Sequence, residues 1–145
     1  MQRRPPERLL DSFLVRVTYM VRNLVKFTIG IAPITKKNHG QIIRNPRTGK
    51  PMMIPSKQYI QYEKDAHWFM PKIDTIDVAV NVQAVFYMPT KRRVDLVNLQ
   101  EALLDVLVKE GILADDNSKI VHSMDGSFVD YDKENPRTEV LIWIV

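Results

Sequence analysis

Cysteine is absent from this chain of 145 residues. A protein without cysteine forms no disulfides and holds no metal through thiolates, which suits a reducing cytoplasm. The sequence also lacks any apolar run near the roughly 20 residues that a membrane-spanning helix needs. Apolar residues nevertheless make up 45% of the chain, which is enough for a packed core. We therefore expect a soluble protein with one domain and no membrane segment.

Acidic residues are scarce in the first half of the chain. Residues 1–72 contain 14 Lys and Arg against 4 Asp and Glu, a formal charge of +10. Residues 73–145 contain 7 against 13, a formal charge of −6. A basic region attracts polyanions such as nucleic acids, and clustered carboxylates can hold a metal. Alternatively, the charged residues of both halves only form solvated surface and bind neither nucleic acid nor metal.

Alternating apolar residues predict four strands. The alternation is strictest in the second of them, where every second residue from Val78 to Phe86 is apolar. The last strand is apolar on both faces, so we expect it to be covered on both sides or buried against another subunit. The strands are predicted at residues 25–31, 77–88, 118–126 and 138–145.

Two stretches have helical spacing. Ser56 is a suitable N-cap for a helix over residues 56–70, which Pro71 ends. A second helix is predicted over about 98–110, with Gly111 as its C-terminal stop. The apolar stripe that we expect this helix to pack on a sheet consists of Leu99, Ala102, Leu103, Val106 and Leu107.

The elements fit a single domain. A long loop over residues 32–56 precedes the first helix, and its segment NPRTGK predicts a hairpin. Residues 1–24 form an N-terminal extension whose order the sequence leaves open, and residues 25–145 form the domain. The order of elements predicts an α+β fold, in which two main helices pack on one face of a mixed β-sheet of about four strands.

Carboxylates stand at both ends of the second predicted helix. Asp95 precedes it, and Asp115 and Asp116 follow it. Helix capping and turn formation would account for these residues without a metal. A helix of 13 residues is about 20 Å long, so Asp95 and Asp116 of one chain share a metal only if the flanking loops fold back. In a two-fold dimer with antiparallel helices, Asp95 of one chain would instead lie beside Asp116 of its mate.

This region resembles the RusA family of Holliday junction resolvases, which is common in phages and prophages. The resemblance rests on the segments RRVDLVNLQEALLDVL and GILADD and on Ile120, with PITKKN and PSKQYIQY upstream, and covers roughly residues 25–145. It implies a small α+β homodimer that binds four-way DNA junctions and cuts them with Mg²⁺, or with Mn²⁺ as an alternative ion. It also implies a cytoplasmic protein that is encoded by a bacterium or a phage.

The chain departs from the family pattern D-x-D-N-L-x-K at two positions. Val97 stands in place of the second aspartate, and Glu101 stands in place of the lysine. Valine cannot ligate a hard cation, which needs oxygen ligands. We therefore expect Glu101 to hold the metal with Asp95 and Asp116, which makes these three the expected catalytic residues. Asp115 either binds the ion as well or orients Asp116. The alternative is that Glu101 is an ordinary solvated helix residue.

Basic residues accompany this framework. Three of them lie just before Asp95, where phosphate contacts would present the scissile bond to the metal, although they would also keep a strand end soluble. The others lie in the loop over residues 32–56, where contacts to phosphates would position DNA without reading its sequence. The residues expected to contact DNA are Lys36, Lys37, Asn38, Arg44, Arg47, Lys50, Lys91, Arg92 and Arg93.

Three functions fit the sequence. The first is a Mg²⁺-dependent, structure-selective DNA endonuclease that resolves four-way junctions as a homodimer, because paired cuts on opposing strands suit two-fold symmetry. The second is a non-catalytic junction-binding protein that lost a metal ligand at Val97. The third, an RNA-binding module, has no aromatic RNA-reading signature to support it.

Overall fold

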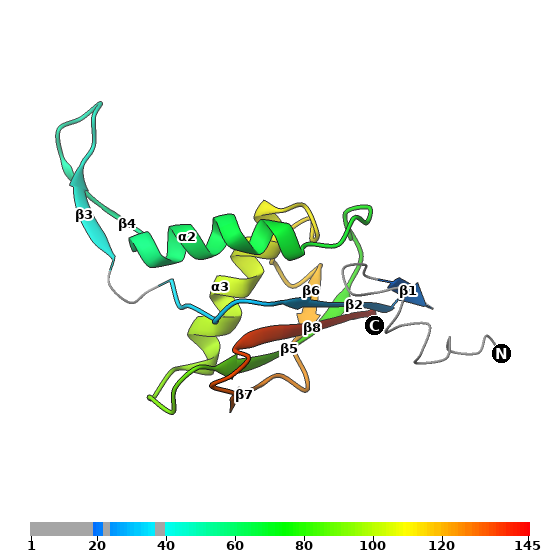
Figure 1. The fold of residues 1–145 in the computed structure, drawn as a ribbon. Helices are drawn as coiled ribbons and strands as arrows, with labels where there is room; N and C mark the ends of the chain where they lie inside the picture. Colours follow the sequence, from blue (N-terminus) through cyan, green and yellow to red (C-terminus); the bar gives the residue numbers. More distant parts are fainter. Residues whose placement is uncertain (1–18, 22–23, 37–39) are drawn as a thin grey trace.

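The structure is a computed structural model, and it describes residues 19–21, 24–36 and 40–145. A sheet carries two helices, and a hairpin projects from this body (Figure 1). The elements are β1 (Tyr19–Val21), β2 (Leu24–Ile29), β3 (Gln41–Arg44), β4 (Pro51–Ile54), α2 (Lys57–Ala66), η1 (His67–Phe69), β5 (Val80–Met88), α3 (Leu96–Lys109), β6 (Val121–Ser123), β7 (Phe128–Tyr131) and β8 (Arg137–Ile144). Within the described ranges, no helix has the length and apolar character to cross a membrane.

The main sheet is mixed, as predicted. Its strand order is β1-β2-β8-β5-β6, and β7 also pairs with β5. β5 runs antiparallel to β8 and parallel to β6 and β7. The parallel pairs are possible because the chain crosses over through α3 between β5 and β6. β6 pairs with β5 near Val80 and β7 pairs with it near Met88, so the two short strands share one edge of β5.

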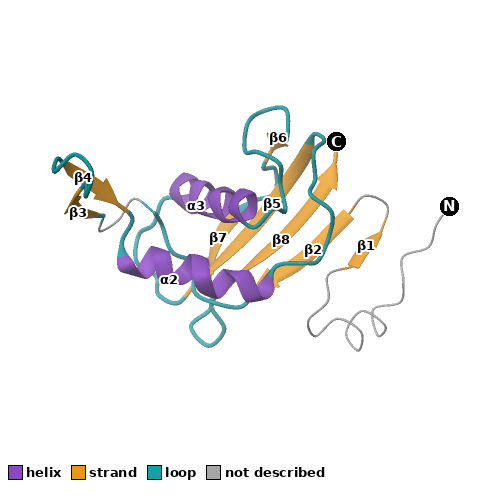
Figure 2. Cartoon of the chain, turned by 90° about the horizontal axis from the view of Figure 1, so that it is seen from above, coloured by secondary structure: helices purple, strands orange, loops and turns teal. Residues whose placement is uncertain are grey.

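Alternation along the strands separates a buried face of the sheet from an open face. On β2, Val25, Phe27 and Ile29 are buried, whereas Lys26 and Thr28 between them are exposed. Both helices lie over the same face of the sheet (Figure 2). Because successive side chains of a strand point to opposite faces, the buried set points toward the helices. The core therefore lies between the two layers, as the predicted fold requires.

α3 packs on the sheet through the predicted apolar stripe. All five stripe residues are at most 1% exposed, namely Leu99, Ala102, Leu103, Val106 and Leu107. The 3.6-residue period of the helix brings them to one side. Beyond the helix, Gly111 adopts a φ of 74°, the left-handed conformation that suits glycine at a helix end. The chain then returns beside the sheet, where Leu113 forms a parallel bridge with Ile76.

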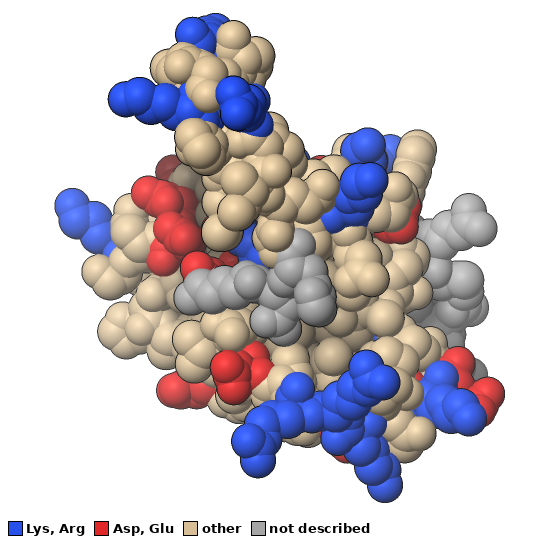
Figure 3. Space-filling model, turned by 90° about the vertical axis from the view of Figure 1, so that its left-hand side faces the viewer, with Lys and Arg blue, Asp and Glu red and all other residues tan. Residues whose placement is uncertain are grey.

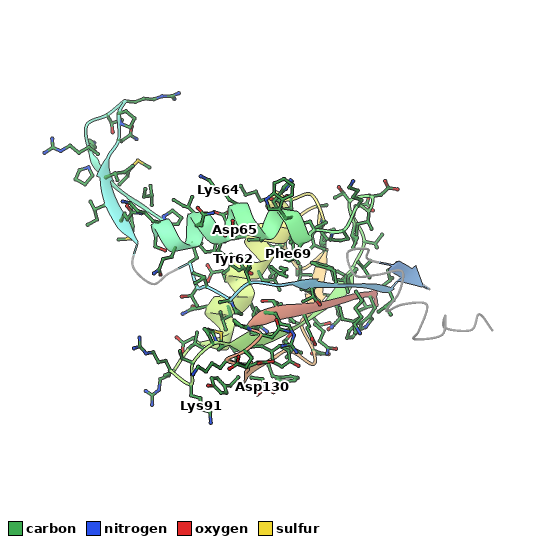
Figure 4. The ribbon with its side chains drawn as sticks, viewed as in Figure 1. Tyr62, Lys64, Asp65, Phe69, Lys91 and Asp130 are labelled. Atoms are coloured by element: carbon green, nitrogen blue, oxygen red, sulfur yellow. The ribbon has the colours of Figure 1, made fainter. Side chains whose placement is uncertain are left out.

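α2 begins at the predicted N-cap and is tied to α3. The hydroxyl of Ser56 accepts a 3.1 Å hydrogen bond from the backbone N–H of Tyr59. The buried Tyr59 side chain donates a 3.1 Å hydrogen bond to the carbonyl of Ala102 in α3. Tyr62 lies on the side of α2 that faces the sheet, and Lys64 lies on the opposite side (Figure 4). These contacts fix α2 over the core.

The predicted hairpin of the long loop is present. β3 and β4 form a two-stranded sheet of their own, in which Ile42 is opposite Met53. The turn closes with a 2.8 Å hydrogen bond from the backbone N–H of Asn45 to the carbonyl of Lys50. Gly49 supplies the positive φ, 67°, that this turn needs. The hairpin is therefore a defined arm rather than an irregular loop.

Two predicted strands are shorter than expected. The strand predicted at residues 77–88 begins at Val80, and Val78 is 45% exposed instead of facing the core. The strand predicted at residues 118–126 is three residues long. At its end the chain bonds to a side chain instead of to a strand. The Asn81 side chain accepts a 2.6 Å hydrogen bond from the Ser123 hydroxyl and a 2.8 Å hydrogen bond from the backbone N–H of Asp125.

Two strands add to the four predicted for the main sheet. β7 lies within the segment DGSFVDYDKEN, whose acidic and turn residues outnumber its few apolar ones, so the sequence does not predict a strand there. It forms because Phe128 and its neighbours pair with the free edge of β5. β1 lies in the N-terminal extension and pairs with β2. The remainder of residues 1–23 lies outside the described residues. The division of the chain at residues 24 and 25 stays a prediction.

The buried tyrosine of α2 predicts a loss of stability at alkaline pH. Burial raises the pKa of Tyr62 from 10.0 to about 12. Because the folded state keeps the phenol neutral, Tyr62 contributes stability that is present in full below pH 10.0 and is lost as the pH rises to about 12. This contribution is at most about 2–3 kcal/mol. We expect the free energy of unfolding, measured by chemical denaturation, to fall less steeply with pH in Tyr62→Phe than in the parent.

The control for this experiment is Tyr131→Phe, which changes a tyrosine that is 40% exposed. It should keep the slope of the parent protein. Equal slopes for the parent and Tyr62→Phe would show that burial of Tyr62 does not control alkaline stability.

Candidate active site

A shallow cleft brings charged groups from distant parts of the chain together beside α3. The cleft has a volume of about 410 Å³ and opens between α2, α3 and the loop that follows α3. Of the expected site residues, Lys36 and Asp116 line it. The complete lining is Lys36, Pro55, Tyr59, Glu63, Asp105, Val108, Lys109 and Asp116. Three carboxylates therefore border one cleft, each from a different element.

Lys36 is the cation that faces these carboxylates. Its ammonium Nζ donates a 2.8 Å hydrogen bond to Oδ2 of Asp105. This bond raises the pKa of Lys36 above 10.5, burial acts in the opposite direction, and the charges of Asp105, Glu101 and Glu63 add to the rise. Lys36 is therefore charged at neutral pH, and the Asp105 carboxylate is engaged by a cation. The pair is partly solvated, so it contributes no more than about 1 kcal/mol to stability.

The cleft is also lined by a neutral phenol and by a second ion pair. Tyr59 contributes a hydroxyl that is already donated to the Ala102 carbonyl, and burial raises the pKa of Tyr59 well above 10.0. This phenol therefore stays protonated near neutral pH. Lys109 donates a 3.1 Å hydrogen bond to Glu63 across the gap between α3 and α2. Each of the two ammonium groups that line the cleft is thus paired with a carboxylate.

Asp116 reaches the cleft through a turn that Asp115 organises. The Asp115 carboxylate accepts a 2.7 Å hydrogen bond from the backbone N–H of Asp116 and a 2.8 Å bond from the side-chain amide of Asn117. The bond from the Asp116 backbone is the main cause that lowers the pKa of Asp115 below 3.8. Both donors engage Asp115 within its own turn. The Asp115 carboxylate is therefore hydrogen-bonded to the backbone of Asp116.

Asp95 stands at the opposite end of α3 from this cleft. It is the N-cap residue, it is exposed, and its carboxylate accepts a 3.3 Å hydrogen bond from the Asn98 amide. Ten residues of helix place Asp95 about 15 Å from Asp105 along the axis of α3. Glu101 is also exposed and lies one turn before Asp105, where its charge acts on Lys36. The structure therefore brings Glu101 and Asp116 to the same region and leaves Asp95 apart.

The donor set suits a hard cation in kind but not in its arrangement within one chain. Carboxylate oxygens are the ligands that Mg²⁺ prefers. In the part of the chain that the structure describes, however, no group of three or more His, Cys, Asp or Glu side chains is placed to hold a metal ion. Val97, at the position of the second aspartate in the family pattern, is 68% exposed. An aspartate at that position would be available to solvent, whereas valine offers no ligand.

Apart from Lys36, which lies in the cleft, the described residues that we expect to contact DNA fall into two basic groups on one side of the molecule. Arg44, Arg47 and Lys50 lie on the hairpin, and residues 91–93 lie in the exposed segment before α3. Lys91 also stacks over the ring of Tyr131, with its Nζ 5.2 Å from the ring centroid. Lys and Arg gather at the projecting hairpin and at the other end of the same face, and carboxylates lie between them (Figure 3). Lys37 and Asn38 lie outside the described residues.

Three charged residues of the cleft, Glu63, Asp105 and Lys109, were not among the expected site residues. Asp105 lies in the segment RRVDLVNLQEALLDVL, on which the family resemblance rests. Nothing in the sequence places Lys36 beside it, because the two residues are 69 positions apart. Glu63 and Lys109 are also joined across the two helices. Helical spacing does place Asp105 one turn after Glu101, and this is the signal by which it could have been found.

The fold and the cleft together define the class of the protein. It is a small α+β protein whose cleft, bordered by three carboxylates, lies between two cationic surfaces that are suited to binding a polyanion such as nucleic acid. The family model described as Endodeoxyribonuclease RusA matches residues 31–143. The chain belongs to this family, and that match confirms the resemblance read from its sequence.

A curated relative supports the same assignment. The chain is 32% identical over 88 residues to a protein of Aquifex aeolicus (strain VF5) named crossover junction endodeoxyribonuclease RusA. The aligned stretch covers 59% of this chain and 66% of the relative's length.

The contact between Lys36 and Asp105 can be tested through the ammonium group itself. In Asp105→Asn we expect the pKa of Lys36, measured by heteronuclear NMR of its side chain, to fall relative to the parent, because the charged acceptor is removed. Asp95→Asn removes a carboxylate about 15 Å away along α3 and should leave that pKa unchanged. An unchanged pKa in Asp105→Asn would rule out the contact in solution.

Proposed function

We propose that this protein is a divalent-metal-dependent, structure-selective endonuclease that resolves four-way DNA junctions in the bacterial cytoplasm. The observation that carries the proposal is the family match over residues 31–143, which includes the cleft from Lys36 to Asp116. Paired hydrolysis on opposing strands needs two active sites related by symmetry, so the working form is a homodimer. Mg²⁺ is the proposed ion, and Mn²⁺ can replace it.

The carboxylates supply what phosphodiester hydrolysis requires. A bound Mg²⁺ neutralises charge that develops on the phosphoryl group and lowers the pKa of a bound water. The residues that would hold it are Asp95, Glu101 and Asp116, with Asp115 fixing the backbone of Asp116. Lys91, Arg92 and Arg93 would hold the phosphates on the side of Asp95.

A shared site in the dimer accounts for the separation of these ligands along α3. Asp95 and Asp116 belong to opposite ends of a helix of 14 residues, which is about 21 Å long. If the α3 helices of two chains lie antiparallel about a two-fold axis, Asp95 of one chain comes beside Glu101 and Asp116 of the other. This arrangement also agrees with the incomplete set of ligands in the described part of a single chain.

The first test is removal of one proposed ligand. We expect Asp116→Asn to cut a labelled four-way junction at least about 100-fold more slowly with Mg²⁺, because losing a few kcal/mol of transition-state stabilisation lowers the rate by this factor. Junction binding, measured by gel shift, should remain. Asp65→Asn is the matched control, because Asp65 is bonded to Gln61 on α2 and does not line the cleft. Full activity of Asp116→Asn would refute its role as a ligand.

The second test separates shared sites from sites within one chain. A mixed dimer is purified with different tags on an Asp95→Asn chain and an Asp116→Asn chain. Shared sites leave one site intact, so a supercoiled plasmid with an extruded cruciform should be converted to the nicked circle but not to the linear form. Each parent homodimer carrying one substitution should do neither. An inactive mixed dimer would place both ligands of a site in one chain.

A non-catalytic junction-binding protein is the second candidate, and the exposed Val97 favours it. Such a protein would bind junctions equally with and without Mg²⁺ and would never nick them. Glu101→Gln refines the comparison, because it removes the carboxylate that we propose in place of the missing aspartate. In the endonuclease this change should raise the Mg²⁺ concentration needed for half-maximal cleavage. Unchanged cleavage at low Mg²⁺ would exclude Glu101 as a ligand.

A further inference from the structure

The β3–β4 hairpin exposes large apolar side chains on an arm that leaves the body of the protein. Its strands pair with each other and form a sheet separate from the main one. Ile42 and Met53 are each 73% exposed, and they are direct partners in the register of the hairpin. The arm extends away from the sheet and helices (Figure 1). Two of the most exposed apolar side chains of the described residues therefore stand side by side on the arm.

The two faces of the hairpin are not equivalent. Side chains alternate across a strand, so Ile42 shares a face with Arg44, and Met53 shares it with Pro51. On the opposite face, Ile43 and Met52 are 39% and 38% exposed, about half the exposure of the first pair. The more exposed apolar pair is thus adjacent to a guanidinium group on the same face. The turn that joins the two strands adds the cations of Arg47 and Lys50. Figure 3 shows the Lys and Arg side chains gathered on the projecting hairpin in blue.

Charge identifies the kind of partner that fits this arm. Residues 36–62 contain six Lys and Arg and no Asp or Glu. A second copy of the arm would bring the same positive charge, so pairing of two arms through their apolar faces is opposed by repulsion. A polyanion is complementary to the arm. Among polyanions, nucleic acid also offers apolar base faces, and proteins insert Ile, Met and Pro side chains between base steps.

We propose that the arm is a wedge that inserts Ile42 and Met53 between bases at the branch point of a DNA junction. Arg44, Arg47 and Lys50 contact the phosphates on either side of the inserted pair. The proposal rests on the proposed function for its DNA substrate and adds a source of structure selectivity to it. Opening a base step costs least where bases are already unpaired or unstacked, so a wedge favours a branch point over continuous duplex.

The position of the arm relative to the cleft supports this assignment. The arm and the segment of residues 91–93 lie on one face, with carboxylates between them (Figure 3). DNA held at both basic groups therefore passes over the carboxylates. The chain from β4 enters α2 directly at the Ser56 cap, and α2 supplies Glu63 to the cleft. The arm is thereby anchored to a wall of the cleft through a short connection.

Fluorescence of 2-aminopurine placed at the branch point tests the wedge. All proteins in this experiment carry Asp116→Asn to suppress cleavage. With the arm intact, binding should raise the fluorescence, because the base loses its stacking partner. Adding Ile42→Ser and Met53→Ser should abolish the rise and weaken junction binding about 10-fold, which corresponds to about 1.4 kcal/mol. Binding to linear duplex should change by less than a factor of about 2, because the cations remain.

Two further variants separate the apolar contacts from the charges and from folding. Ile43→Ser with Met52→Ser alters the less exposed face and should keep the fluorescence rise. Replacing Arg44, Arg47 and Lys50 with Gln should weaken binding to junction and duplex alike and reduce the slope of log affinity against log salt by about 2–3. Circular dichroism and sedimentation of each variant report the fold and the oligomeric state.

The outcomes distinguish this inference from the proposed function. If the unaltered protein cuts junctions but its arm produces no fluorescence rise, the wedge is wrong and the endonuclease stands. If Ile42→Ser with Met53→Ser leaves the fluorescence rise intact and dissociates the dimer, the arm joins two copies instead. If no junction is cut with Mg²⁺ or Mn²⁺, the endonuclease fails, whereas an arm-dependent rise on the junction still supports the wedge.

Discussion

The packing of α3 on the sheet is the constraint on which the rest of the structure depends. Leu99, Leu103 and Leu107 extend over two turns and are each at most 1% exposed, so the helix cannot rotate or slide without exposing them. Full exposure of one such side chain costs about 1.5–3 kcal/mol, a large part of a typical stability of about 5–15 kcal/mol. The fixed helix determines where Asp95 stands at its beginning and where Asp105 faces the cleft.

The cleft is therefore positioned by apolar packing and not by its own ion pairs. The contacts of Lys36 with Asp105 and of Lys109 with Glu63 join partly solvated groups and are individually weak. Their effect is electrostatic, because they place two cations among carboxylates that would otherwise repel one another. Tyr59, which is buried and bonded to the α3 backbone, provides the firm connection between the walls.

The uneven distribution of charge along the chain becomes a spatial pattern in the fold. The basic first half supplies Lys36 and the arm, whereas the acidic second half supplies Asp105 and Asp116. Basic groups on both sides of a carboxylate region attract a polyanion and hold it over that region. In the proposed endonuclease, the cations bind the substrate, the carboxylates hold the metal, and the apolar arm recognises the branch point.

The sequence by itself determined the features that neighbouring residues encode. The stripe of α3, the Ser56 cap, the glycine stop at Gly111 and the hairpin all follow from local spacing, and the segment around Asp95 identified the family. The tertiary structure alone decided that Lys36 meets Asp105, that β7 completes the edge of β5, and that Asp95 lies apart from the cleft. The physical reason is that helix and turn patterns arise between residues a few positions apart, whereas contacts across 69 positions exist only after a helix has packed on a sheet.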